Sequence, residues 1–168
     1  KLLLDLTDLD SKRLRLEWVS AAEGQRFAQV VTEFTEQIRK LGPSPISGET
    51  VKQKILLNVK AAKNAASNTR LRVLVGREIE LTEKTNVYRE KVPQETFDSS
   101  LREAVESEFI RQKIYLLTRT EPLSVKALAE VTGLGPAIVL KQLVNMRRRN
   151  MIAVDRVKGT TPLYRALG

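Results

Sequence analysis

The tightest constraint on the fold lies near the C-terminus, where Gly133-Leu134-Gly135-Pro136 separates two short apolar repeats. Ser124 precedes the first repeat and predicts the N-cap of a short helix. Pro136 suits the first position of the next helix, because its missing amide would have no partner there. The pattern therefore predicts two helices joined by a three-residue turn.

Further elements are expected on both sides of this turn. Apolar spacing predicts a long helix at about residues 97–118 before it. Asn150 suits the left-handed end of the last helix, and residues 151–154 and 163–167 read as two strands with a hairpin tip at 157–161. The side chains assigned to the inner face of the last helix are Val139, Leu140, Leu143, Val144 and Met146. This order of elements is typical of a winged helix-turn-helix, and residues 96–168 resemble the winged-helix superfamily.

The C-terminal part is also the most basic, since residues 101–168 carry 12 basic and 6 acidic side chains. The candidate partner or nucleic-acid face consists of Lys141, Gln142, Asn145, Arg148, Arg149, Arg156 and Lys158. Cations there would meet phosphates, while Gln142 and Asn145 would read base edges. Two other interpretations stay open: a solvated helix end whose cations suit the macrodipole, and a surface that docks protein.

The chain contains no Cys and no His. Thiolate nucleophiles, Ser–His catalysis, Cys-ligated zinc and iron–sulfur ligation by these residues are therefore excluded. We expect a non-catalytic binding or coupling piece. No apolar run is long enough for a membrane span and no signal peptide is visible, so we expect a cytoplasmic protein. Because the sequence opens on Lys1 in what reads as the end of a helix over residues 1–9, we expect that it begins inside a longer protein.

In the N-terminal part, residues 13–19 alternate polar and apolar side chains and predict a strand. Trp18 would anchor this strand, with Leu14 and Leu16, to a following helix. The apolar stripe of that helix is Phe27, Val30, Val31, Phe34, Ile38 and Leu41.

Two signals mark the ends of the same helix. Ser20 and Glu23 have the spacing of a capping box at its start, and Gly42 is a natural stop before Pro43. Such a turn between strand and helix is also where α/β proteins bind ligands, but a plain helix cap is the favoured interpretation. Residues 1–45 therefore read as an α/β fragment that lacks neighbouring strands.

The middle part predicts a helical connector. Gly48-Glu49 leads into a helix whose stripe is Val51, Ile55, Val59, Ala62 and Ala66. Ser67-Asn68-Thr69 interrupts the pattern, and a second helix carries Leu71, Leu74, Val75 and Ile79. We expect these two helices to pair as an antiparallel hairpin with solvated lysines and arginines.

The stretch from Arg15 to Ala28, which includes Trp18-Val19-Ser20-Ala21-Ala22-Glu23-Gly24, resembles the end of the delta subunit of methyl-viologen-reducing hydrogenase. The helix that closes at Leu41-Gly42-Pro43 fits the same family. The resemblance implies a relay of electrons between a hydrogenase or dehydrogenase and a heterodisulfide reductase-like flavoprotein. It also implies a 2Fe–2S cluster on cysteines expected upstream of Lys1, and FAD in a partner or fused subunit.

The sequence thus predicts a mainly α protein with small β elements (α+β): an α/β fragment at 1–45, a helical connector at 46–95 and a winged helix at 96–168. The expected function is that of an electron-transfer subunit, or its C-terminal part, acting as a relay and docking module without membrane insertion. The alternatives are a winged-helix DNA-binding regulator and a cofactor-free assembly scaffold.

Overall fold

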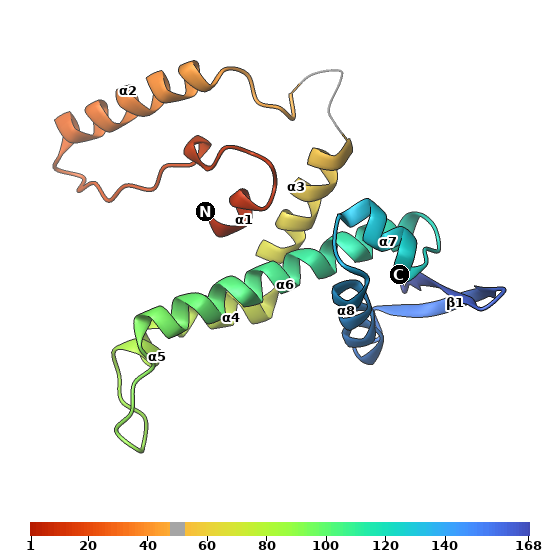
Figure 1. Ribbon diagram of the computed structural model, residues 1–168. Coiled ribbons are helices and arrows are strands. Elements are labelled where there is room, and N and C mark those ends of the chain that lie inside the picture. The colour runs from red at the N-terminus through yellow and green to blue at the C-terminus, as the bar shows by residue number, and fades with distance from the viewer. Residues whose placement is uncertain (48–52) are drawn as a thin grey trace.

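The computed structural model describes residues 1–47 and 53–168 and is mostly helical, with one small antiparallel sheet (Figure 1). The predicted α+β composition is confirmed at this level. The helices are α1 (Leu2–Asp5), α2 (Gly24–Leu41), α3 (Gln53–Ala66), α4 (Thr69–Gly76), α5 (Glu78–Thr82), α6 (Gln94–Thr120), α7 (Val125–Thr132) and α8 (Pro136–Arg148). A short 3-10 turn covers Ser11–Arg13, and the strands are β1 (Ile152–Lys158) and β2 (Thr161–Ala166).

The long helix α6 is the element on which most of the other helices and the hairpin pack, with α2 as the exception (Figure 1). On one side, Phe109 lies in a cluster with Ala61 and Ala62 of α3 and with leucines of α1. Further along, Val105 packs with Ala65 and with Leu71 of α4. The expected pairing of the two connector helices is formed only in part: Ala65 of α3 and Leu71 of α4 share a cluster with Val105 of α6, whereas Val73 and Val75 of α4 are 53% and 51% exposed.

The C-terminal elements form a third cluster around Ile114 of α6. Leu128 of α7, Val139, Leu143 and Met146 of α8, and Ile152 of β1 are all at most 1% exposed and pack together there. Tyr164 of β2 exchanges two backbone hydrogen bonds with Leu123, at 3.0 and 2.9 Å, which ties the start of α7 to the hairpin.

The local signals at these C-terminal ends are confirmed. The Ser124 hydroxyl accepts a hydrogen bond from the Ala127 amide at 3.1 Å. Gly133 has φ +73°, Asn150 has φ +55°, and Pro136 is the first residue of α8. β1 and β2 pair from Ile152↔Ala166 to Lys158↔Thr161, so the turn at Gly159 is tighter than the predicted tip.

The predicted inner stripe of α8 is only partly correct. Leu140 and Val144 are 47% and 43% exposed, whereas Val139, Leu143 and Met146 are buried. The buried three follow i, i+4 and i+7 and face α6 and α7. Leu140 and Val144 lie one residue after Val139 and Leu143, which turns them out of the cluster.

The predicted strand at residues 13–19 is not formed. The segment is extended but hydrogen-bonds to no neighbouring strand in the described part of the chain, and the only described sheet is the C-terminal hairpin. Trp18 is 85% exposed and Leu16 76%, so the prediction that Trp18 is a buried anchor is also wrong. A strand requires a partner for its backbone groups, and alternation alone does not supply one.

Helix α2 begins later than predicted and has no buried residue. The Glu23 carboxylate accepts from the Ser20 amide at 2.8 Å, but Ser20 Oγ accepts only a long bond from Ala22. This half of a capping box closes a turn, and α2 starts at Gly24. The stop at Gly42 is confirmed, with φ +70°.

The expected helix end at residues 1–9 shortens to α1, followed by a turn in which Asp8 has φ +64°. The lead-in Gly48-Glu49 and the stripe position Val51 lie outside the described residues. Taken singly, no described helix has the length and apolarity for a membrane span; α7 and α8 meet that criterion only together, across a 115° bend.

Candidate interaction surfaces

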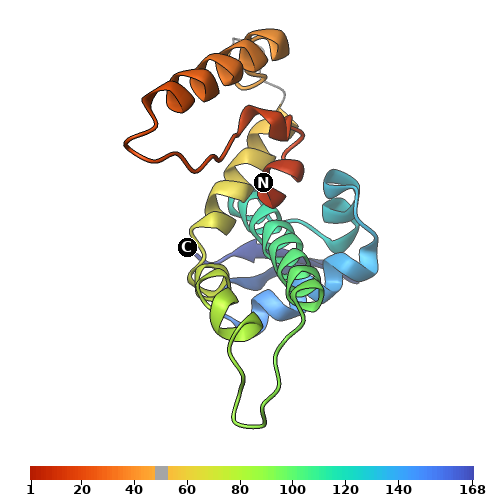
Figure 2. The same ribbon diagram turned by 90° about the vertical axis from the view of Figure 1, so that its left-hand side faces the viewer.

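A group of large apolar side chains is exposed around α2. Leu16 and Trp18 belong to the extended segment before α2 and are 76% and 85% exposed, whereas Phe27 and Val31 belong to α2 and are 60% and 45% exposed. We call these four side chains together the N-terminal apolar surface, although Arg15, Glu17 and Val19 are the members of the segment that face α2. A shallow groove of about 350 Å³ lies beside it, between the extended segment and α2, and Phe27 and Val31 line it. Figure 2 shows α2 standing away from α6, so the main core does not cover this surface.

Polar contacts hold the extended segment along α2. The Arg13 guanidinium donates to the carbonyl oxygens of Leu41, Gly42 and Pro43 at 2.9–3.0 Å, which satisfies the C-terminal end of the helix. Arg15 pairs with Glu33 at 3.1 Å. These hydrogen bonds hold the segment that carries Leu16 and Trp18 next to α2.

These ion pairs have the expected electrostatic signature. Hydrogen bonds to Glu17 and Glu33 raise the pKa of Arg15. Hydrogen bonds from Gln29 and Arg15 lower the pKa of Glu33. The side chains of Arg15 and Glu33 are 28% and 47% exposed, so solvent screens the pair and we assign it an orienting role and little net stability.

One member of the predicted face on α8 and the hairpin is buried. Gln142 was expected to be exposed, yet it is only 5% exposed, and its amide donates to Ser107 Oγ of α6 at 3.1 Å. Asn145 is half-buried. Gln142 therefore joins two helices and is not available to read a base edge.

The remaining cations separate into two groups. Lys141, Arg148, Arg156 and Lys158 are exposed on α8 and the hairpin, and we call these four the basic surface. Asp155 lies 3.1 Å from Arg165 and 4.0 Å from Arg156, so it partly neutralises the hairpin end. Arg149 lies elsewhere, in a groove bordered by α4 and α6.

That groove contains residues to which we assigned no role from sequence, Ser107, Glu108 and Arg111. Arg111 is 7% exposed and pairs with Glu108, while its second terminal nitrogen lies 3.3 Å from Ser107 Oγ. From sequence, charged residues in a helix are expected to face solvent. Glu108 and Arg111 are buried because α6 packs against helices on more than one side. No sequence signal would have located them.

Comparison with known families bears on the N-terminal segment alone. Residues 1–42 match the family model of the methyl-viologen-reducing hydrogenase delta subunit. The N-terminal quarter of the chain is a match to the delta-subunit family. This confirms the resemblance read from the sequence.

Relatives of two kinds match short stretches of the chain. The F420-non-reducing hydrogenase iron-sulfur subunit of Archaeoglobus profundus is 56% identical over 43 residues, covering 26% of this chain and 31% of the relative. One subunit of the ferredoxin:CoB-CoM heterodisulfide reductase of Methanosarcina mazei is 54% identical over 35 residues, or 21% of this chain and 4% of the relative. The vhu iron-sulfur subunit of the F420-non-reducing hydrogenase of Methanococcus maripaludis is 37% identical over 46 residues, or 27% of this chain and 34% of the relative.

The chain spans about a third or less of the length of these curated relatives. No solved structure matches it.

The residues present do not fit an iron–sulfur cluster. Such clusters are held by thiolates, with imidazole replacing some of them in one class, and this chain has neither Cys nor His. Among the described residues there is also no group of three or more acidic side chains placed to hold a metal ion.

Proposed function

We propose that this chain is the docking part of an electron-transfer subunit in an oxidoreductase complex of the hydrogenase–heterodisulfide reductase type. The carrying observation is that residues 1–42 match the delta-subunit family and that a 35-residue stretch of the chain is 54% identical to a heterodisulfide reductase subunit. Short stretches of this chain thus match two proteins whose names place them in such complexes. We infer that residues 1–42 serve as a contact module and act in the cytoplasm.

The geometry of the segment supports this role. Trp18 and Phe27 are the kind of large aromatic anchors that dominate protein interfaces, and both are more than half exposed. Contiguous exposed apolar surface on a protein usually marks a contact site. The N-terminal apolar surface is therefore where we place the flavoprotein subunit.

The electron carriers belong to residues outside this chain. A 2Fe–2S cluster would require cysteines preceding Lys1 in a longer protein, and FAD would belong to the flavoprotein partner. The hydrogenase or dehydrogenase would be the other partner. The role proposed for the 168 residues is positioning, with no bond chemistry.

We further propose that residues 96–168 are a winged helix that docks protein, attached through the connector at 46–95 to the delta-subunit segment at 1–45. The 115° bend between α7 and α8 over a three-residue turn fits a helix-turn-helix. Leu140 and Val144 lie exposed on α8, the helix that would enter a DNA groove. Apolar side chains beside Lys141 favour a protein partner.

The test uses the single tryptophan of the chain as a reporter. The free protein should show red-shifted fluorescence that iodide quenches, because the indole is exposed. Adding the heterodisulfide reductase-type flavoprotein subunit should shift the emission to the blue and protect it. Phe27→Ala should abolish this change and co-purification, whereas Val87→Ala, in a remote exposed loop, should leave both intact. An unchanged spectrum and equal co-purification of both variants would contradict the proposal.

A DNA-binding regulator remains the second candidate, and the exposed cations Lys141, Arg148 and Lys158 favour it. With Gln142 buried, we expect only weak, sequence-blind binding that falls steeply with salt. Selection from a random duplex pool at physiological salt tests this. One enriched site, lost on Asn145→Ala, would promote the regulator over the docking module.

A further inference from the structure

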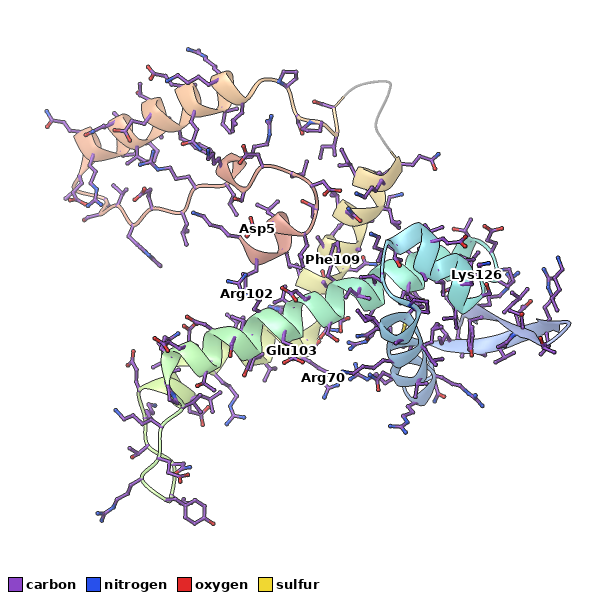
Figure 3. All side chains as sticks on the ribbon, viewed as in Figure 1. Asp5, Arg70, Arg102, Glu103, Phe109 and Lys126 are labelled. Atoms are coloured by element: carbon purple, nitrogen blue, oxygen red, sulfur yellow. The ribbon has the colours of Figure 1, made fainter. Side chains whose placement is uncertain are left out.

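We propose that the groove at the junction of α4, α6 and α8 binds a small phosphate-type anion through Arg70, Arg149 and the Ser107 hydroxyl. The groove has a volume of about 350 Å³ and is lined by side chains from α4, from α6 and from the residue after α8. Figure 3 shows Arg70 on the side of α4 that faces α8. The site is independent of the proposed function.

The groove has an excess of positive charge. Arg70, Arg111 and Arg149 line it, and Glu108 is its one acidic residue. Glu108 pairs with Arg111, and within the described ranges neither Arg70 nor Arg149 forms an ion pair. Two guanidinium groups therefore line a groove whose one acidic residue is already paired with a third, Arg111.

Arg111, the buried arginine of the groove, also lies in an environment with more positive than negative charge. Arg111 Nε is buried and has no hydrogen-bond partner among the described residues. Burial lowers the pKa of Arg111, and the nearby charges of Arg149 and Arg70 lower it further, against the opposing effect of Glu108. A bound anion would relieve this repulsion.

Ser107 supplies a neutral donor at the same place. Its Oγ accepts from Arg111 at 3.3 Å and from Gln142 at 3.1 Å, and its own proton has no acceptor in the described part of the chain. Two forked guanidinium groups and a hydroxyl match the oxygens of a phosphate, which Arg recognises in bidentate fashion. Leu71 and Leu74 form an apolar border of the groove, which could contact the organic part of a phosphomonoester.

Inorganic phosphate is the first probe, compared with sodium chloride at equal ionic strength on the 168-residue chain. Phosphate should raise the melting temperature where chloride does not, since a ligand that binds only the native state stabilises it. Calorimetric titration should show affinity about tenfold or more weaker for Arg70→Gln and Arg149→Gln, as loss of a charged hydrogen bond implies. Both side chains are exposed, so the variants should melt in chloride no lower than the parent.

Arg72→Gln and Arg147→Gln are the matched controls, because they remove a charge from the same two helices outside the groove. They should bind phosphate within about twofold of the parent. Equal stabilisation by chloride, or equal weakening in the controls, would overturn the site in favour of diffuse attraction.

Adenosine monophosphate is the second probe and separates two sources of the anion. Tighter binding than inorganic phosphate would identify a phosphomonoester whose remainder contacts Leu71 and Leu74. Equal binding would identify free phosphate. Absence of binding by both probes would refute the proposal.

Discussion

At the scale of single residues, two side chains of α8 with the same predicted role differ in how far they are exposed to solvent. Gln142 and Asn145 are three residues apart on α8, and both were candidates for reading bases. The first is buried against Ser107 of α6, while the second is half-buried. The position of α6 makes this difference.

We expect Gln142→Ala to lower the free energy of unfolding by about 1–3 kcal/mol, because it removes a buried hydrogen bond and leaves Ser107 without that donor. Asn145→Ala should change it by less than about 0.5 kcal/mol. Urea denaturation of the two variants measures the difference. Equal stabilities would show that the α6–α8 bond does not form.

The leucines of α8 provide a second matched pair. Leu143 is 1% exposed and Leu140 is 47% exposed. Leu143→Ala should destabilise by about 2–5 kcal/mol, since it empties the C-terminal core. Leu140→Ala should cost less than about 1 kcal/mol. Thermal and chemical unfolding check this, and the reverse order would mean that α8 is rotated.

At the scale of elements, capping side chains set where a helix begins, as Asn68 does for α4. Asn68 ends the break between α3 and α4, and its side-chain oxygen accepts from the amides of Arg70 and Leu71 at 2.9 and 3.4 Å. The interruption read at Ser67-Asn68-Thr69 is therefore a helix cap, which places Leu71 against α6.

Asn68→Ala should destabilise the chain by about 1 kcal/mol, because two amides at the start of α4 lose their acceptor. Asn68→Ser keeps an oxygen at the cap and should recover most of the loss. Circular dichroism during urea unfolding measures both variants. Equal losses in Ala and Ser would assign the effect to something other than capping.

At the scale of the whole molecule, α6 contributes to all three clusters of the core. Phe109 packs with α3, and Ile114 packs with α7 and α8, about one helical turn further on. Helix α2, in contrast, has no buried residue. Cooperative stability should therefore extend over α3 to β2 and exclude α2.

Native-state hydrogen exchange tests this division. The amides of α3, α6 and α8 should exchange only through large openings with similar free energies, and those of α2 through local fraying with little protection. Binding of the flavoprotein partner should then protect α2. Protection of α2 equal to that of α6 in the free chain would contradict this prediction.

The sequence by itself determined the C-terminal elements. Ser124, Gly133, Pro136 and Asn150 act through their own backbone preferences, which need no distant partner, and each lies where it was predicted. It also determined the delta-subunit resemblance, because identity over a short segment does not depend on packing.

Tertiary structure alone decided which faces are covered. Alternation at residues 13–19 and the stripe on α2 predict burial, yet these two parts lie only against each other, and no further described element covers them. Conversely, Arg111 and Gln142 are polar and nevertheless buried, because α6 is packed on more than one side. Exposure depends on residues far away in the chain, so local pattern cannot fix it.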